Sequence, residues 1–318
     1  MKANRTLLPA AIALFVTCLP LPAAEEGWLV SFEKAKAAAA KEGKAIFMEF
    51  TGSDWCPPCI ALQKNVLSKD VFKEQMPRHF ILLKLDSPRD KSKQSPEEIE
   101  QYKTLSKEYA VSGVPTIYLA DATGKPFARR VGYGSSVSAE DYIKDMVTKA
   151  ALLKERDEAI AQASAAKGVA RARLLDAALS KLDADLVQKH YGEWVSEIIK
   201  LDEKDEAGLK TKYEGAAKAA NTKAALQAIV RTPRAANAAP PKPAEYVARI
   251  AKLIETDKPE GETLQEALYY KAMYLMRDNK PAEARKAAQD AKRAAPDSPM
   301  VPRIDLLLKQ AVDPKAIL

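Results

Sequence analysis

The chain has 318 residues, of which 47% are apolar and 29% are charged, so it can bury a substantial core and divide into two or three domains. Its net charge is +7, but the Lys and Arg residues are interleaved with Asp and Glu, and only 7% of the residues are aromatic. This pattern is typical of a solvated surface of mixed charge rather than of a nucleic-acid-binding surface, so we expect no nucleic acid partner.

The first 24 residues have the features of a secretory signal. A basic start precedes an apolar run from Leu7 to Leu21, small residues follow the run, and cleavage is predicted near Ala23 or Ala24. We therefore predict a signal peptide over 1–24 and an exported, periplasmic or extracytoplasmic protein. The alternative is an uncleaved N-terminal membrane anchor, although the run is shorter than the ~20 residues of a spanning helix.

Residues 25–150 alternate between helical and strand patterns, which predicts one α/β domain. Gly43 is typical of a helix end, and Ser95 followed by Pro96 is typical of a helix start. In chain order we predict a helix over 30–44, strands over 45–51 and 79–86, a helix from Ser95, a hairpin over 115–120 and 126–133, and a helix from Ser138 onward.

The sequence after residue 150 is rich in Ala, Lys, Glu and Leu and predicts an all-α region. Prolines and alanines concentrate in one stretch, as in a linker. We divide this part into a helical region over 151–230, a Pro- and Ala-rich linker over 231–244, and a second helical region over 245–318.

The second helical region weakly resembles a tetratricopeptide repeat. Its Ala272, Ala284, Ala291 and Pro296 have the spacing of that repeat, which predicts a repeat-like helical hairpin. Chance is the alternative explanation, because an alanine-rich chain produces the same spacing easily.

Cys56 and Cys59 in "WCPPC" are the only cysteines beyond Cys18, which a cleaved signal peptide would remove. A zinc site needs four ligands, and the only histidines, His79 and His190, lie far apart in sequence, so we assign no metal. A purely structural bridge would constrain little of the unfolded chain, because the loop is so small. A redox pair is the remaining interpretation.

The redox interpretation has a physical mechanism. The pair follows a predicted strand and opens a helix that runs through "IALQKNVL", so free backbone N–H groups and the helix dipole would favour a thiolate at Cys56. Cys59, one turn later, would resolve a mixed disulfide by attacking Cys56. Pro57 suits the first helical turn, and together with Pro58 it stiffens this turn.

Here the sequence resembles the thioredoxin superfamily over about 27–150, through "WCPPC" and "SGVPT". It is similar to exported thioredoxin-like oxidoreductases of the TlpA and CcmG kind. The resemblance implies a thioredoxin fold, in which a central mixed sheet is flanked by helices, followed here by the helical region. It also implies that Pro115 is a cis-proline, that the backbone of Val114 pairs with an extended substrate, and that Trp55 contacts the substrate.

The resemblance further implies a role for Glu49, which takes the place of an acidic residue that lies buried beneath the cysteine pair. Its carboxylate would accept the proton of Cys59 as that residue attacks. Lys84 takes the place of a lysine near this carboxylate. The alternative is that Glu49 and Lys84 are ordinary strand residues with no role in the chemistry.

Together these features predict an exported thiol-disulfide oxidoreductase that exchanges the Cys56–Cys59 disulfide with protein disulfide or dithiol substrates. A reductase is favoured, because "PP" lacks the histidine that the strong oxidant DsbA has between its cysteines. A membrane thiol carrier would supply electrons, and no cofactor or metal is expected. The alternatives are a disulfide oxidase or isomerase, or a helical scaffold or client-binding protein that uses the thioredoxin domain as a recognition module.

Overall fold

The computed structural model of the protein describes residues 27–231 and 241–312. The predicted signal peptide, Cys18 and most of the predicted linker lie outside these ranges. The chain divides into two compact units, one made of Met1–Asp157 and Lys181–Leu186 and the other of Glu158–Ser180 and Val187–Leu318. Within the described ranges, none of the helices combines the length and the apolar character that a membrane crossing requires.

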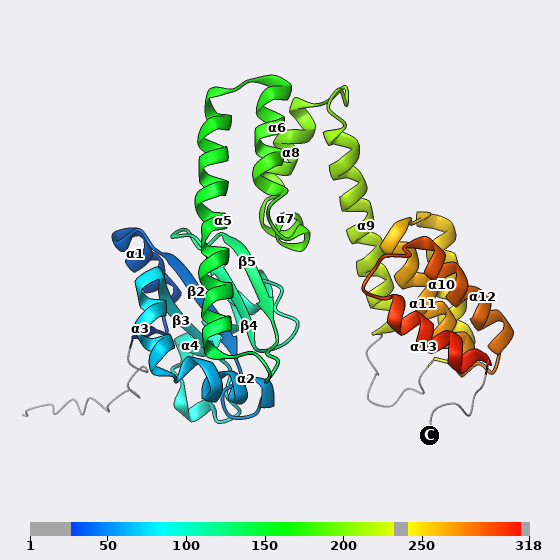
Figure 1. Ribbon diagram of the computed structural model, residues 1–318, viewed down its shortest axis with the longest axis horizontal. Coiled ribbons are helices and arrows are strands. Elements are labelled where there is room, and N and C mark those ends of the chain that lie inside the picture. Colours follow the sequence, from blue (N-terminus) through cyan, green and yellow to red (C-terminus); the bar gives the residue numbers. More distant parts are fainter. Residues whose placement is uncertain (1–26, 232–240, 313–318) are drawn as a thin grey trace, which may run out of the picture. The chain divides into compact units, whose positions relative to one another are not determined.

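The first unit is built on a five-stranded mixed sheet with the order β1-β3-β2-β4-β5 (Figure 1). Strands β1, β3 and β2 are parallel, whereas β4 is antiparallel to both β2 and β5. The elements are β1 (Trp28–Leu29), α1 (Phe32–Glu42), β2 (Ala45–Thr51), α2 (Pro57–Leu62), a π-helical turn (Gln63–Leu67), α3 (Asp70–His79), β3 (Phe80–Asp86), a short 3-10 turn (Lys91–Lys93), α4 (Pro96–Glu108), β4 (Thr116–Ala120), β5 (Pro126–Val131) and α5 (Ala139–Ala165). The predicted α/β class is confirmed.

The central strand β2 is buried along its whole length, because helices cover both faces of the sheet. One face carries Met48 and packs against α1 and α4 through Ala35, Ala39 and Leu105. The opposite face carries Phe47, whose ring lies 5.8 Å from that of Phe72 on α3. Alternate residues of β2 therefore pack into two separate cores, and the odd-numbered residues lie on the face toward α3.

Local capping explains where the first helices begin and end. Gly43 adopts a left-handed conformation at the end of α1, with φ 63°, as its position in the sequence predicts. Ser95 and Glu98 form a reciprocal capping box at the start of α4, where each side chain accepts a hydrogen bond from the other residue's N–H. The sequence analysis missed α3, a mostly polar helix with Pro77 in its last turns.

The rest of the described chain is helical, as predicted. Helix α5 continues past residue 150 to Ala165, and the division between the two units falls within it, after Asp157. It is followed by α6 (Gly168–Leu179), α7 (Ala184–His190), α8 (Gly192–Leu201), α9 (Leu209–Val230), α10 (Pro243–Asp257), α11 (Gly261–Arg277), α12 (Pro281–Ala294) and α13 (Val301–Val312).

Helices α11 and α12 form a hairpin in the second unit (Figure 1). Ala272, Ala284 and Ala291, which suggested a hairpin from their spacing, are all fully buried in the core that these helices share with α13. Small side chains at these positions let the helix backbones approach closely, which explains the alanine-rich composition.

In the first unit, Gly124 lies in the turn between β4 and β5 and allows a test of how closely Phe32 packs against this turn. Its φ is +92°, and an added Cβ would lie 2.5 Å from the ring of Phe32. Gly132 also has a positive φ, +77°, but open space around it. We expect Gly124→Ala to lower the free energy of unfolding by about 2–4 kcal/mol, from backbone strain plus overpacking, and Gly132→Ala by about 1–2 kcal/mol from strain alone.

Urea unfolding followed by far-ultraviolet circular dichroism measures both values. Equal losses in the two variants would contradict close packing of Phe32 against this turn.

Candidate active site

Cys56 and Cys59 lie at the start of α2 and are joined by a disulfide. Cys56 is the N-cap residue, with extended backbone angles, and Pro57 and Pro58 occupy the first turn. The Cys59 N–H donates a hydrogen bond to the Sγ of Cys56 over 3.4 Å. The Cys56 N–H in turn donates to the Gly52 carbonyl over 3.0 Å, which ties the helix start to the end of β2.

This geometry treats the two sulfurs differently. Pro57 and Pro58 carry no N–H, so the Cys59 N–H is the first-turn donor that reaches the Cys56 sulfur at the N-cap, where negative charge is stabilised. Cys59 lies inside the helix and is 1% exposed, against 3% for Cys56. The arrangement therefore favours negative charge on Cys56.

The loop before β4 lies beside the disulfide. The Val114–Pro115 peptide bond is cis, which confirms the conformation that the resemblance implied for Pro115. The carbonyl oxygen of Val114 lies 3.3 Å from the Sγ of Cys56. The Gly132 N–H donates to the Pro115 carbonyl over 2.7 Å and fixes this loop against the end of β5. A backbone carbonyl is thus held next to the sulfur at the N-cap.

Glu49 is buried in β2, where it is only 1% exposed. It is in register with Lys84 on β3 and Ile117 on β4, so these side chains share one face of the sheet. The Nζ of Lys84 lies 3.4 Å from Oε1 of Gln63, directly after α2, so this face is the one beneath the cysteine helix. The structure therefore places a buried carboxylate and a lysine in the layer under α2.

Arg130 and Tyr142 lie next to this layer and were missed in the sequence analysis. Arg130 is in register with Ile117, and its guanidinium lies 4.7 Å from the ring centre of Tyr142 and 2.7 Å from Asp145. Burial, together with the negative charge of Glu49, raises the pKa of Tyr142 above its ordinary value, although Arg130 opposes this shift. Within the part of the chain that the structure describes, the Tyr142 hydroxyl has no hydrogen-bond partner.

Trp55 stands at the rim of the site and is 39% exposed. Its Nε1–H donates to the Ser87 carbonyl over 2.8 Å, and one side of the indole packs so closely on Gly52 that an added Cβ would lie 2.5 Å from it. The Cζ of Arg89 lies 6.0 Å from the ring centre. The indole is therefore held by its hydrogen bond to Ser87 and by its contact with Gly52.

Asp54 links the active-site turn to the segment that follows β3. One carboxylate oxygen accepts the Arg89 N–H over 2.9 Å, and the other accepts the Asp90 N–H over 3.3 Å. The first of these hydrogen bonds is the main cause that lowers the pKa of Asp54. The sequence analysis gave no role to this segment, because contacts between residues 35 or 36 positions apart leave no periodic signal.

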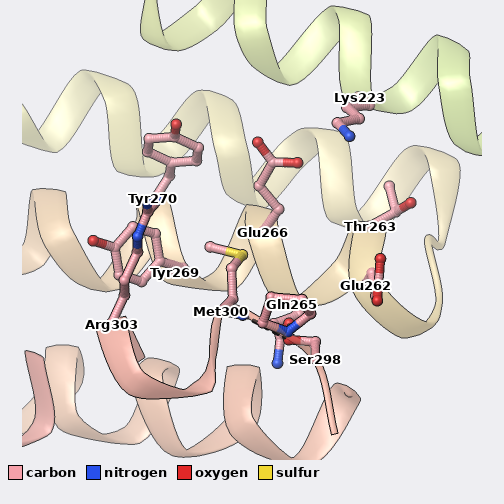
Figure 2. Close-up of a pocket in the computed structure, with 11 residues that line it drawn as sticks. Lys223, Glu262, Thr263, Gln265, Glu266, Tyr269, Tyr270, Ser298, Met300 and Arg303 are labelled. Atoms are coloured by element: carbon pink, nitrogen blue, oxygen red, sulfur yellow. Dashed lines mark hydrogen bonds between the residues drawn. The ribbon is translucent and has the colours of Figure 1, made fainter. Parts of the chain in front are cut away.

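A separate cavity of about 460 Å³ lies within the helical unit, between α9, α11 and the start of α13. Gln265, which is fully buried, supports it by donating to the carbonyls of Ala291 and Ala295 and accepting from the Ser298 hydroxyl. Figure 2 shows Tyr269, Tyr270 and Arg303 together on one side of this cavity, with Lys223, Thr263 and Glu262 on the other. Aromatic surface and charges of both signs thus line one hollow.

Comparisons with known proteins agree with the geometry around the cysteines. Residues 32–146 match the family described as a thioredoxin-like domain. The chain is 34% identical over 110 residues to a protein named disulfide bond reductase DsbH from Chlamydia pneumoniae. The match covers 35% of this chain and 65% of that relative's length.

Two solved structures are also similar. One, named DsbH oxidoreductase, is 27% identical, with 45% of this chain and 96% of that chain covered and a TM-score of 0.37. The other, the C-terminal domain of Neisseria meningitidis DsbD in the oxidised form, is 19% identical, with 36% and 90% covered and a TM-score of 0.26. Residues 32–146 of this chain, with Cys56 and Cys59 at the start of α2, form a thioredoxin-like domain.

Proposed function

We propose that this protein is an exported thiol-disulfide oxidoreductase that works as a reductase of protein disulfides. The observation that carries the proposal is the hydrogen bond from the Cys59 N–H to the Sγ of Cys56 at the start of α2. This position favours a thiolate at Cys56, the form that attacks disulfides. The Val114 carbonyl beside that sulfur supports docking of an extended client strand across the site.

The reaction moves two electrons from the protein to a client. In the reduced protein, the Cys56 thiolate attacks one sulfur of a client disulfide, the client S–S bond breaks, and the second client sulfur leaves as a thiolate that takes up a proton. Cys59 then loses its proton and attacks Cys56, which forms the Cys56–Cys59 bond and releases the other client sulfur as a thiol. The client gains two electrons and two protons in all.

We assign the role of proton acceptor for Cys59 to Glu49. Its burial beneath α2, in register with Lys84, supports this assignment because a buried carboxylate binds a proton more readily than an exposed one. Trp55, Val114 and Pro115 are assigned to client contact, since all three lie at the rim of the disulfide or in the loop beside it.

Two observations support the reductive direction. The residues between the cysteines are prolines, so the chain lacks a histidine there that would stabilise the reduced form of a strong oxidant. The similar Chlamydia pneumoniae protein is named as a disulfide bond reductase. After each turnover, an external dithiol must return two electrons to Cys56–Cys59, and for an exported protein we propose a membrane thiol carrier as its source.

The cavity of the helical unit supports a second function, the binding of client polypeptides. Its wall along α11 runs from Glu262 to Tyr270, about 12 Å at the rise of an α-helix, which matches three to four residues of extended chain. Tyrosine, methionine and arginine, which are enriched at protein interfaces, all line it, at Tyr269, Met300 and Arg303. Helices that hold a client would complement a domain that reduces it.

The different positions of the two sulfurs predict different reactivities. In the reduced protein at pH 7, iodoacetamide should alkylate Cys56 at least about tenfold faster than Cys59, because the Cys56 sulfur lies at the N-cap and accepts the Cys59 N–H. Mass spectrometry of the protein after short reaction times measures both rates, and the Cys56→Ser and Cys59→Ser variants serve as controls. Faster modification of Cys59 would contradict the assignment of the attacking sulfur.

The reduction potential of the Cys56–Cys59 couple tests the direction. Mature protein, expected to start after Ala23 or Ala24 by N-terminal sequencing, is equilibrated in dithiothreitol or glutathione buffers and followed by tryptophan fluorescence. We expect a potential near that of thioredoxin, about −270 mV, and reduction of insulin that Cys56→Ser abolishes. A potential near that of DsbA, about −120 mV, would instead indicate an oxidase or isomerase.

The client-binding cavity is tested with an unfolded protein that has no free thiols, fluorescein-labelled carboxymethylated ribonuclease A. We expect Tyr269→Ala and Arg303→Ala each to weaken its binding by about fivefold or more, as truncation of an interface anchor does. Arg293→Ala, an exposed arginine of α12 outside the cavity, is the matched control. Unchanged fluorescence anisotropy titrations for both cavity variants would exclude this site.

A further inference from the structure

Trp55, already assigned to client contact, forms one exposed surface with Arg89, whose side chain has no role in the proposed chemistry. The indole is 39% exposed, and the guanidinium of Arg89 lies 6.0 Å from its ring centre. Ile60 of α2 is also exposed, at 45%. The rim next to Cys56 therefore offers an apolar contact and a cation together, which we name the Trp55–Arg89 surface.

The segments that carry this surface are held by hydrogen bonds between carboxylate side chains and backbone groups. Asp54 binds the N–H groups of both Arg89 and Asp90, and the Ser87 carbonyl accepts the indole N–H of Trp55. Asp86 accepts both the N–H and the hydroxyl of Ser53, over 3.0 and 2.5 Å, which adds a second link between the two segments. The backbone of Arg89 and the indole of Trp55 are thus held near the turn that carries Cys56.

The charged side chains of this region differ in whether they have a hydrogen-bond or ion-pair partner. The carboxylate of Asp90 accepts the N–H and the hydroxyl of Ser92 and lies 3.8 Å from Lys93, and the carboxylates of Asp54 and Asp86 hold backbone groups and Ser53. The Arg89 guanidinium, by contrast, is exposed and has no carboxylate partner in residues 27–231 or 241–312. Arg89 and Lys91, whose Nζ donates to the Ser87 hydroxyl over 3.2 Å, are thus the cations of this segment that pair with no carboxylate of the described residues, and of these Arg89 is the one whose guanidinium lies 6.0 Å from the Trp55 ring centre.

We propose that the Trp55–Arg89 surface selects client segments that carry a carboxylate close to their cysteine. An acidic side chain would pair with Arg89 while its neighbouring apolar atoms cover Trp55, and the covered ring would partly shield that ion pair from water. The partner is therefore an acidic client segment. Asp54 is a positioning residue here, because it acts through the backbone of Arg89. The inference rests on the proposed reductase function.

The test uses two peptides that differ in one residue. Each has a single cysteine joined to cysteamine, which carries no carboxylate, by a disulfide, with Glu two residues after the cysteine in one peptide and Gln there in the other. Reduced protein attacks the mixed disulfide, so each turnover oxidises Cys56–Cys59 and releases the peptide thiol and cysteamine. Stopped-flow tryptophan fluorescence gives kcat/KM from the oxidation of the protein. We expect a preference of about two- to fivefold for the Glu peptide, the range of an exposed ion pair.

Variants locate the source of this preference. Arg89→Gln should remove it, and Arg89→Lys, which keeps the charge, should restore most of it. Asp54→Ala should also reduce it although Arg89 is intact, because the backbone N–H groups of residues 89 and 90 lose their acceptor. None of these changes should move the reduction potential, since none touches the sulfurs. Lys107→Gln, an exposed cation in the last turn of α4, alters net charge equally and should keep the preference.

The outcomes separate this inference from the proposed function. If the wild-type protein reduces both peptides at the same rate, the reductase stands and the selection of acidic clients is wrong. An equal loss of preference in Lys107→Gln would assign the effect to net charge and would also overturn the inference. If neither peptide is reduced, the proposed function itself fails. If Asp54→Ala keeps the preference for the Glu peptide, the role of Asp54 as a positioning residue for Arg89 is wrong.

Discussion

The candidate active site depends on one local constraint, the position of the Cys56 sulfur at the N-terminus of α2. The Cys59 N–H reaches that sulfur only because Cys56 is the N-cap residue and has an extended backbone. Strand β2 fixes where the helix begins, since it is buried throughout and pairs with strands on both sides. Pro57 and Pro58 oppose any shift of this start, because their φ angles are restricted.

The layer beneath the disulfide carries charge that a protein core ordinarily excludes. Glu49 is buried there in register with Lys84, and Arg130 lies two strands away against Tyr142. Burial of an ionised side chain is unfavourable unless partners compensate for the lost hydration. These charged residues therefore contribute little to the folding stability by themselves. The place of Glu49 in the layer under α2 suits a group that exchanges a proton during the resolving step, as we propose.

The Trp55–Arg89 surface and the cavity of the helical unit, the two binding sites that we propose, are stabilised in the same way. At the rim of the disulfide, Asp54 joins two distant segments by accepting two backbone N–H groups. In the helical unit, Gln265 joins α11 to the end of α12 by donating to two backbone carbonyls. In both cases one polar side chain satisfies main-chain groups and so fixes the wall of a surface, which leaves other side chains of that wall available for a partner.

The sequence alone determined the features that depend on neighbouring residues. The strand before the cysteines, the caps at Gly43 and Ser95 and the helical character after residue 150 follow from hydrophobic periodicity and capping, which act within one or two turns. Position within a known motif identified the cis bond before Pro115. Tertiary structure alone decided that Arg130 faces Tyr142 and that Asp54 holds the backbone of Arg89. These contacts join residues 12 to 35 positions apart, and only the packing of strands and helices brings such residues together.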